Sequence, residues 1–276
     1  MLTRLSNYAQ MMNHDPLGFV IYLISFAVAI LTSLILHECA HGYVAYLCGD
    51  PTAKMMGRLD LRPSHHLDPV GTICMVLLGF GWAKPVPVNP RYFRNYRRDD
   101  FLVSIAGIVT NFVLFLVCTL LSVGALYSMV GGGFVLNVRY TDGSKELLRM
   151  ADPSTRESIY YLFMGYLLDG SATSELTRFM VTPWLQHVVR FLMLMSQINI
   201  SLAIFNFLPI PPLDGYHIVN DLIFKGRFQL NRDMFRIAQL VLLALCWTGA
   251  LSGVLGTCVR GVSGFFLRFF LGLIPA

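Results

Sequence analysis

Long runs of apolar residues alternate with shorter polar segments along most of this chain. Four runs are long enough for a helix to cross a hydrocarbon core, which takes about 20 residues, and they cover residues 17–49, 101–130, 185–208 and 237–258. Only helices and closed barrels satisfy their backbone hydrogen bonds in lipid, and these runs are too long for barrel strands. The pattern therefore predicts an all-α polytopic membrane protein with about four transmembrane helices.

Two other apolar stretches do not fit this pattern. Residues 70–83 are too short for a full crossing and contain three glycines, which favours a re-entrant β-hairpin or loop. Residues 261–276 contain Arg268, so this stretch either spans the membrane or lies in its interface. Between the first two spans, residues 54–61 could supply a strand.

Composition points to lipid as the main solvent of the chain. Hydrophobic residues make up 55% of the sequence and charged residues 13%, whereas about 25% charged residues is usual in soluble domains. The first apolar run has no small-residue cleavage pattern at its end, so we expect no removable signal peptide. The six cysteines are scattered without a CxxC pair, which argues against a disulfide framework or a cysteine zinc site.

The charged residues predict how the chain is oriented. Residues 50–100 carry eight Lys or Arg against five Asp, so we expect them to form a cytosolic and re-entrant substrate-binding region. Residues 131–183 carry five basic and six acidic side chains, and we expect a polar extracytoplasmic insertion there. The amino terminus would then lie outside. The basic residues behind the net charge of +5 sit beside membrane segments, so we expect no nucleic acid partner.

The first span contains an HExxH motif, His37-Glu38-Cys39-Ala40-His41. On a helix, residues four apart share a face with about 5–6 Å between their Cβ atoms, so the two imidazoles can hold one metal ion. Zinc with three protein ligands keeps a position for water, and Glu38 can take the proton of that water. These polar groups would cost several kcal/mol in an apolar helix unless they coordinated or paired with something.

A third metal ligand has to come from elsewhere in the chain. Asp214 is the best candidate, because it follows the third span at the predicted cytosolic membrane edge, at the depth of His41. Asp221 and Asp233 are expected in more polar surroundings, and His217 is a weaker rival. Without the HExxH motif, Asp214 would read as an ordinary turn residue.

Several motifs occur together in a characteristic order. HECAHG, GRLDLRP, HLDPVGT, GWAKPVPVNP and AGIVTN lie within residues 37–111, and NFLPIPPLDG covers residues 206–215. With this set, the chain resembles the site-2 protease family of zinc intramembrane metalloproteases, and its compact members without PDZ or CBS domains. The resemblance implies that His37, His41 and Asp214 bind Zn²⁺, that Glu38 is the general base, and that the active site lies slightly below the cytosolic membrane face.

Four further residues are candidates for substrate binding: Asn111, Asn206, Gly79 and Gly81. The amide of Asn111 could hydrogen bond a substrate carbonyl or a developing oxyanion, although a helix-packing contact would also explain it. Asn206 either binds the substrate backbone or caps the end of the third span. Gly79 and Gly81 lie in a segment that resembles the family's loop beside the active site, where an extended substrate could add as a strand, but a plain re-entrant turn has the same composition.

We therefore expect residues 1–276 to form one membrane-embedded protease domain in a prokaryotic cell membrane. It would cleave a transmembrane segment of a membrane protein by zinc-activated water, a reaction known as regulated intramembrane proteolysis. Its expected partners are that substrate and the lipid bilayer, and the oligomeric state is left open. Two rivals also stay open: an ion or metal transporter, which also places His and Asp in the membrane, and an inactive regulator that only binds transmembrane helices.

Overall fold

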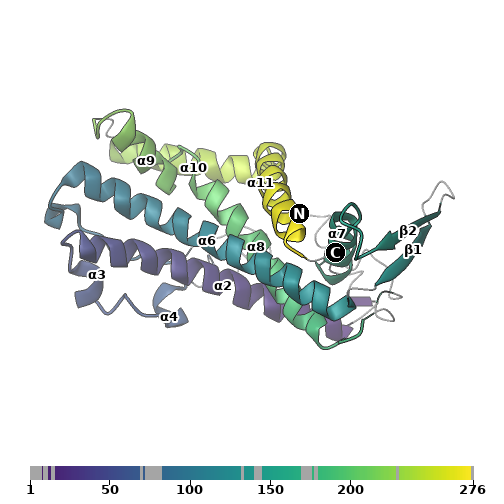
Figure 1. Cartoon of the computed structure of the whole chain (residues 1–276). Helices are drawn as coiled ribbons and strands as arrows, with labels where there is room; N and C mark the ends of the chain where they lie inside the picture. The colour runs from purple at the N-terminus through teal and green to yellow at the C-terminus, as the bar shows by residue number, and fades with distance from the viewer. Residues whose placement is uncertain are drawn as a thin grey trace. The chain divides into compact units, whose positions relative to one another are not determined.

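The computed structural model describes residues 8, 12–13, 16–68, 71, 83–131, 134–139, 145–168, 176, 180–227 and 230–274. Helices make up most of this part of the chain (Figure 1). The longer ones are α2 (Pro16–Leu47), α6 (Tyr96–Val130), α8 (Leu185–Asn206), α10 (Arg232–Thr248) and α11 (Ser252–Gly272). The shorter ones are α3 (Thr52–Met55), α4 (Pro63–His66), η1 (Pro90–Tyr92), α7 (Arg156–Leu168) and α9 (Asp214–Leu222).

Within the described ranges, four helices are long and apolar enough to cross a membrane: α2, α6, α8 and α11. The prediction of an all-α integral membrane protein with about four spans is thereby confirmed. The position predicted for the fourth span, residues 237–258, is wrong. The helix α10 ends at Thr248, Gly249 adopts the left-handed conformation with φ 74°, and α11 begins at Ser252. A left-handed glycine is a common helix stop, and apolarity alone does not reveal it.

The segment between the first two spans also differs in part from the prediction. Residues 54–61 form no strand, because α3 occupies residues 52–55 and a turn follows with Gly57 at φ 63°. Most of the predicted re-entrant element, residues 70–83, lies outside the described residues, and the hairpin itself stays a prediction. Where the chain returns, Leu67 and Ala83 form an isolated antiparallel bridge.

Contacts divide the chain into two compact units. Unit 1 comprises Met1–Ala29, Phe115–Gln197 and Gly261–Ala276, and its core is built from apolar residues of α6, α7, α8 and α11. In the same unit β1 (Val135–Arg139) pairs antiparallel with β2 (Lys145–Arg149), and Figure 1 shows this hairpin beside α7. The guanidinium of Arg156, only 2% exposed, donates hydrogen bonds to the backbone carbonyls of Met150, Ala151, Leu271 and Ile274.

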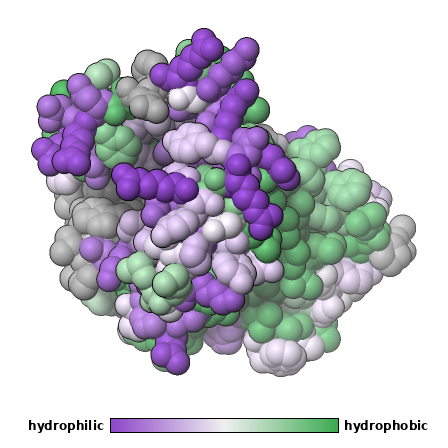
Figure 2. Space-filling view, turned by 90° about the vertical axis from the view of Figure 1, so that its left-hand side faces the viewer, coloured by the Kyte–Doolittle hydropathy of each residue, from purple (hydrophilic) through white to green (hydrophobic). Residues whose placement is uncertain are grey.

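Unit 2 comprises Ile30–Leu114 and Ile198–Arg260. A small core of Ile108, Ala203 and Ile218 joins α6, α8 and α9. Arg97 at the start of α6 donates to the backbone oxygen of Asp221 and so holds the end of α9. Hydrophilic side chains gather on the part of unit 2 that carries α3, α9 and the start of α6 (Figure 2). Unit 2 therefore brings the HExxH segment of α2 into the same packed region as α9.

Candidate metal centre

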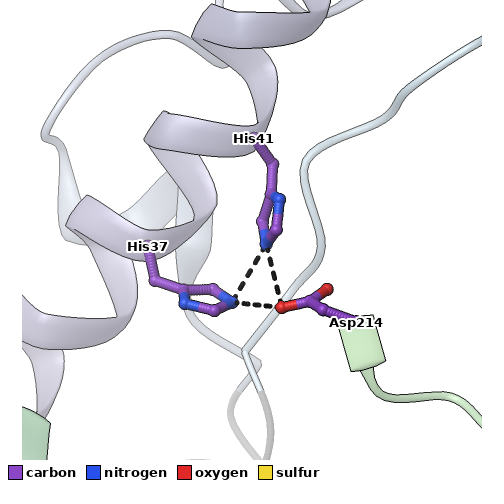
Figure 3. A group of neighbouring side chains, drawn as sticks. All are labelled: His37, His41 and Asp214. Atoms are coloured by element: carbon purple, nitrogen blue, oxygen red, sulfur yellow. Dashed lines mark hydrogen bonds and ion pairs between the residues drawn. The ribbon is translucent and has the colours of Figure 1, made fainter. Parts of the chain in front are cut away.

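Three potential ligand atoms meet in unit 2, from His37 and His41 on α2 and from Asp214 at the start of α9 (Figure 3). The Nε2 atoms of the two histidines are 3.0 Å apart. The Oδ2 atom of Asp214 lies 3.3 Å from Nε2 of His37 and 3.4 Å from Nε2 of His41. Both histidines are buried, with 5% and 9% of their surface exposed. Residues far apart in the sequence therefore form one compact triangle of donor atoms.

The size of this triangle fits a zinc ion. Ligands about 2.0–2.1 Å from tetrahedral zinc lie about 3.3–3.4 Å from one another, close to the 3.0–3.4 Å observed. Lone pairs of imidazole and carboxylate that face each other at such distances repel unless a proton or a cation lies between them. Two imidazoles and one carboxylate are also a usual ligand set for zinc with one open position. The geometry and the chemistry of the three side chains therefore suit Zn²⁺.

The second ring nitrogen of each histidine is held by α6. Nδ1 of His41 donates to the backbone oxygen of Val103 at 2.7 Å, which leaves the Nε2 lone pair free for a metal. Nδ1 of His37 lies 3.1 Å from Nδ2 of Asn111, whose amide is fully buried. With that amide turned over, its oxygen would accept the Nδ1 proton, as a ligating histidine requires. The helix α6 thus fixes the orientation of both rings.

Gly107 allows α6 to approach the two imidazoles. A Cβ atom at this position would lie 2.5 Å from Cε1 of His37 and 2.5 Å from Nε2 of His41. Val103, Gly107 and Asn111 follow one another at intervals of four residues, so they share one face of α6. That face of α6 lines the site. The carbonyl of Val103, the backbone of Gly107 and the amide of Asn111 each contact a histidine.

Asp214 is placed by the turn between α8 and α9. Leu213 is extended and α9 begins at Asp214, while Gly215 lies directly against the backbone oxygens of Phe207 and Leu208. Burial opposes ionisation of Asp214, but when no metal is bound and Nε2 of the two rings carries a proton, hydrogen bonds from His37 and His41 outweigh burial and hold the pKa of the carboxyl well below its usual range. The carboxylate is therefore ionised and faces the two rings.

Glu38 follows His37 on α2 and is half-buried. Its Oε2 accepts a hydrogen bond from the backbone N–H of Val86 at 2.9 Å. Val86 belongs to the motif GWAKPVPVNP, so two of the motifs that carried the family resemblance contact each other here.

The other candidate residues have different outcomes. Asn111 does reach the cluster, but its contact in this structure is with His37 and not with an open space. Asn206 is the last residue of α8. Gly79 and Gly81 lie outside the described residues. A role in substrate binding stays a prediction for all four.

The rival ligands do not join the cluster. Nδ1 of His217 lies 3.2 Å from Oδ2 of Asp100. This hydrogen bond raises the pKa of His217, and burial, which lowers the pKa, does not cancel the rise. Asp221 is buried, with 1% of its surface exposed, and its charged or titratable neighbours are Asp100, His217 and Arg97. Burial and then the neighbouring Asp100 carboxylate raise the pKa of Asp221 to about 6, and its protonated form hydrogen bonds to Asp100.

Some residues that shape the site carry no signal in the sequence. Val103 acts through its backbone carbonyl, which any residue would supply. The clearance at Gly107 and the amide of Val86 depend on which segments pack together. The Gly-x-x-x-Asn spacing on α6 was the available clue, and it indicates that both residues face the same neighbour.

Comparisons with known proteins were consistent with one another. The family model of peptidase family M50 matches residues 25–249, a range that contains the HExxH motif and Asp214. A protein of Bacillus subtilis (strain 168) named "Putative zinc metalloprotease YwhC" is 35% identical over 211 residues, which cover 76% of this chain and 73% of that protein. No solved structure matches the chain significantly.

Proposed function

This chain belongs to peptidase family M50, and we propose that it is a zinc metalloprotease that cleaves a transmembrane segment of a membrane protein. The family match confirms the resemblance predicted from the motifs and supports a metalloprotease. The observation that carries the finer proposal is the triangle of His37, His41 and Asp214, whose ligand atoms have zinc spacing on helices of an integral membrane protein. A metal centre held among such helices favours a peptide bond that lies in the membrane as its substrate.

In this proposal His37, His41 and Asp214 hold Zn²⁺. A zinc ion there supplies Lewis acidity, which makes water acidic near neutral pH and polarises a peptide carbonyl. Glu38 takes a proton from the attacking water and later passes it to the leaving amine. Val103 and Asn111 keep the two imidazoles oriented, and the surrounding apolar helices limit the access of bulk water.

We also propose how a substrate is held. Residues 84–89 form neither a helix nor a strand, and the Leu67–Ala83 bridge joins the two ends of the segment that contains Gly79 and Gly81. An extended substrate could add its backbone to such a segment, with Asn111 and Asn206 as further hydrogen-bonding partners. A helical substrate would have to unwind for this, which requires that its backbone hydrogen bonds find new partners.

The orientation belongs to the same proposal. The basic residues of segment 50–100 support a cytosolic position for the metal centre, in a chain whose named relative is bacterial. The segment 131–183 would then lie on the other side of the membrane. We propose that residues 1–276 act as one protease domain with this extracytoplasmic insertion.

A cleavage assay with purified protein tests the proposal. The chain is reconstituted in vesicles with a single-pass membrane protein, and products are followed with and without a chelator. We expect cleavage that stops with the chelator and returns with zinc. Glu38→Gln should keep stoichiometric zinc and lose cleavage, whereas Asp214→Asn should lose zinc. Transport of metal ions without cleavage would favour a transporter, and helix binding without cleavage would favour an inactive regulator.

A further inference from the structure

The segment before α6 is anchored to unit 2 at both of its ends. The backbone N–H of Lys84 donates to the carbonyl of His66 at 2.8 Å, and the backbone N–H of Asn89 donates to Oδ2 of Asp50 at 2.6 Å. Asp50 is completely buried, so the second anchor is a fixed point. Residues 84–89 are therefore held in place at both ends, although they form no regular secondary structure.

The middle of this segment has one amide that can donate a hydrogen bond. Pro85 and Pro87 have no N–H, so the amide of Val86 is alone between them. That amide donates to Oε2 of Glu38. The side chain of Val86, 6% exposed, packs on the bare backbone of Gly42, where an added Cβ would lie 2.7 Å from Cγ1 of Val86. Glu38 and Gly42 are one helical turn apart, so Val86 contacts α2 at two successive positions of one face.

Arg58 holds the peptide groups that precede this amide. Its Nη2 atom donates to the carbonyl of Lys84 at 3.1 Å and to the carbonyl of Pro85 at 3.2 Å. Only 9% of Arg58 is exposed, and a buried guanidinium with two carbonyl acceptors has a restricted position. The carbonyl of Pro85 and the N–H of Val86 belong to the same planar peptide group. Fixing that oxygen therefore fixes the direction of the N–H that Glu38 accepts.

We propose that Arg58 is a positioning residue that acts through the Pro85–Val86 peptide to orient the Glu38 carboxylate. The inference rests on the proposed function, in which Glu38 is the general base. With Oε2 held by Val86, the carboxylate keeps one rotamer and its Oε1 is left for proton transfer. Without the hydrogen bond, the side chain samples other rotamers, and misplacement of a base by about 1 Å can cost roughly 100-fold in rate.

The hydrogen bond can be measured without metal, substrate or activity. Hydrogen–deuterium exchange of overlapping peptides covering residues 84–88 reports the Val86 amide once the contributions of Lys84 and Val88 are separated, because the two prolines contribute no signal. We expect this amide to be protected in the metal-free wild-type protein and to exchange at least about 10-fold faster in Arg58→Met. It should also exchange faster in Glu38→Asp, whose shorter side chain does not reach Val86. Unchanged protection in Arg58→Met would overturn the proposal.

The kinetic test separates positioning from simple structural support. In Arg58→Met, kcat should fall roughly 10- to 100-fold, as for other residues that orient a catalytic group, while KM and zinc content stay near their wild-type values. The thermal midpoint should fall as well, because two buried carbonyls lose their donor, so kcat is measured well below the midpoint of the variant. Arg62→Met is the matched control, because its side chain is 76% exposed and its nearest acidic group is 3.6 Å away. Equal losses of kcat in Arg58→Met and Arg62→Met, or a higher KM with an unchanged kcat, would contradict a positioning role.

A double-mutant cycle tests whether Arg58 acts through Glu38. In the Glu38→Asp background, Arg58→Met should lower kcat by less than about threefold, because the hydrogen bond is already lost. A full 10- to 100-fold loss in that background would overturn the inference. If Glu38→Asp turnover falls below detection, the amide exchange decides. The two proposals fail differently: wild-type protein without chelator-sensitive cleavage would refute the protease, whereas normal cleavage with a freely exchanging Val86 amide would refute the role of Arg58.

Discussion

Adding a single methyl group at Gly107 should disable the metal centre without unfolding the protein. In Gly107→Ala the new Cβ would lie 2.5 Å from Nε2 of His41, 2.5 Å from Cε1 of His37 and 2.7 Å from Nδ1 of His37. Non-bonded heavy atoms prefer about 3.5–4.0 Å, so the rings or α6 have to move by about 1 Å. The collision involves both proposed histidine ligands and one of the metal-binding nitrogens.

The expected magnitudes follow from this displacement. Metal–ligand distances are tolerated within about 0.2 Å, so a shift of about 1 Å removes at least one ligand and should weaken zinc binding at least about 100-fold. Overpacking costs about 1–3 kcal/mol, and replacing a helical glycine by alanine returns about 1 kcal/mol. The metal-free protein should therefore lose no more than about 2 kcal/mol of stability.

The assay combines zinc content with thermal unfolding of the metal-free protein in detergent. Gly124→Ala is the matched control, since it lies on the same helix and its added Cβ would meet nothing within 4 Å. The control should bind stoichiometric zinc and cleave substrate at the wild-type rate. Gly107→Ala should be folded, nearly free of zinc and inactive.

Two results would refute this reasoning. If Gly107→Ala bound zinc with wild-type affinity, α6 could not lie against the imidazoles as the structure places it. If Gly107→Ala and Gly124→Ala lost zinc equally, the cause would be a general effect of alanine on α6 and not the collision at the rings.

Three further variants probe other parts of the structure. In Gly215→Ala the new Cβ would strike the backbone oxygen of Phe207, so the turn that places the Asp214 carboxylate should shift, with loss of zinc and a lower thermal midpoint. Asp221 has a folded-state pKa of about 6, above the ordinary value of about 3.9, so stability should fall as pH rises from about 4 to about 6. Asp221→Asn, which stays neutral and can donate to Asp100, should be more stable than the wild-type protein at pH 8, with little change near pH 4. Arg156→Met should cost about 3 kcal/mol or more, measured by thermal unfolding, because buried carbonyls lose their donor.

For each of these three predictions, one experimental result would contradict it. Normal zinc content in Gly215→Ala would mean that the turn after α8 tolerates a side chain. If the stability of the wild-type protein did not decline between pH 4 and pH 6, Asp221 could not have the raised pKa that comes from burial and from Asp100. For Arg156→Met the comparison is Arg62→Met, whose exposed ion pair with Asp60 lies between two spans and should contribute less than about 1 kcal/mol. Equal losses in both arginine variants would argue against the buried anchor.

The sequence by itself determined the solvent and the fold class, and it predicted the chemistry of the site. Apolar runs near 20 residues require helices in lipid because the backbone has no other partner there. HExxH determines that two imidazoles share a helix face, because the helical period is a local property. The sequence also predicted Asp214 as the third ligand, from its place at the end of an apolar run, and the structure places its carboxylate beside the two imidazoles. The apolar pattern misplaced the fourth span, because the left-handed Gly249 ends a helix inside a stretch that is largely apolar.

Only the tertiary structure decided which groups meet across the fold. The triangle of 3.0–3.4 Å, the methyl-sized clearance at Gly107 and the burial of Asp221 all depend on how separate helices pack. The Val86 amide and the Val103 carbonyl are backbone atoms, present at nearly every position, so their residue types carry no mark of their partners. Side-chain type records the chemistry that a position can perform, whereas the partner of a backbone group is set by long-range packing, which no local pattern encodes.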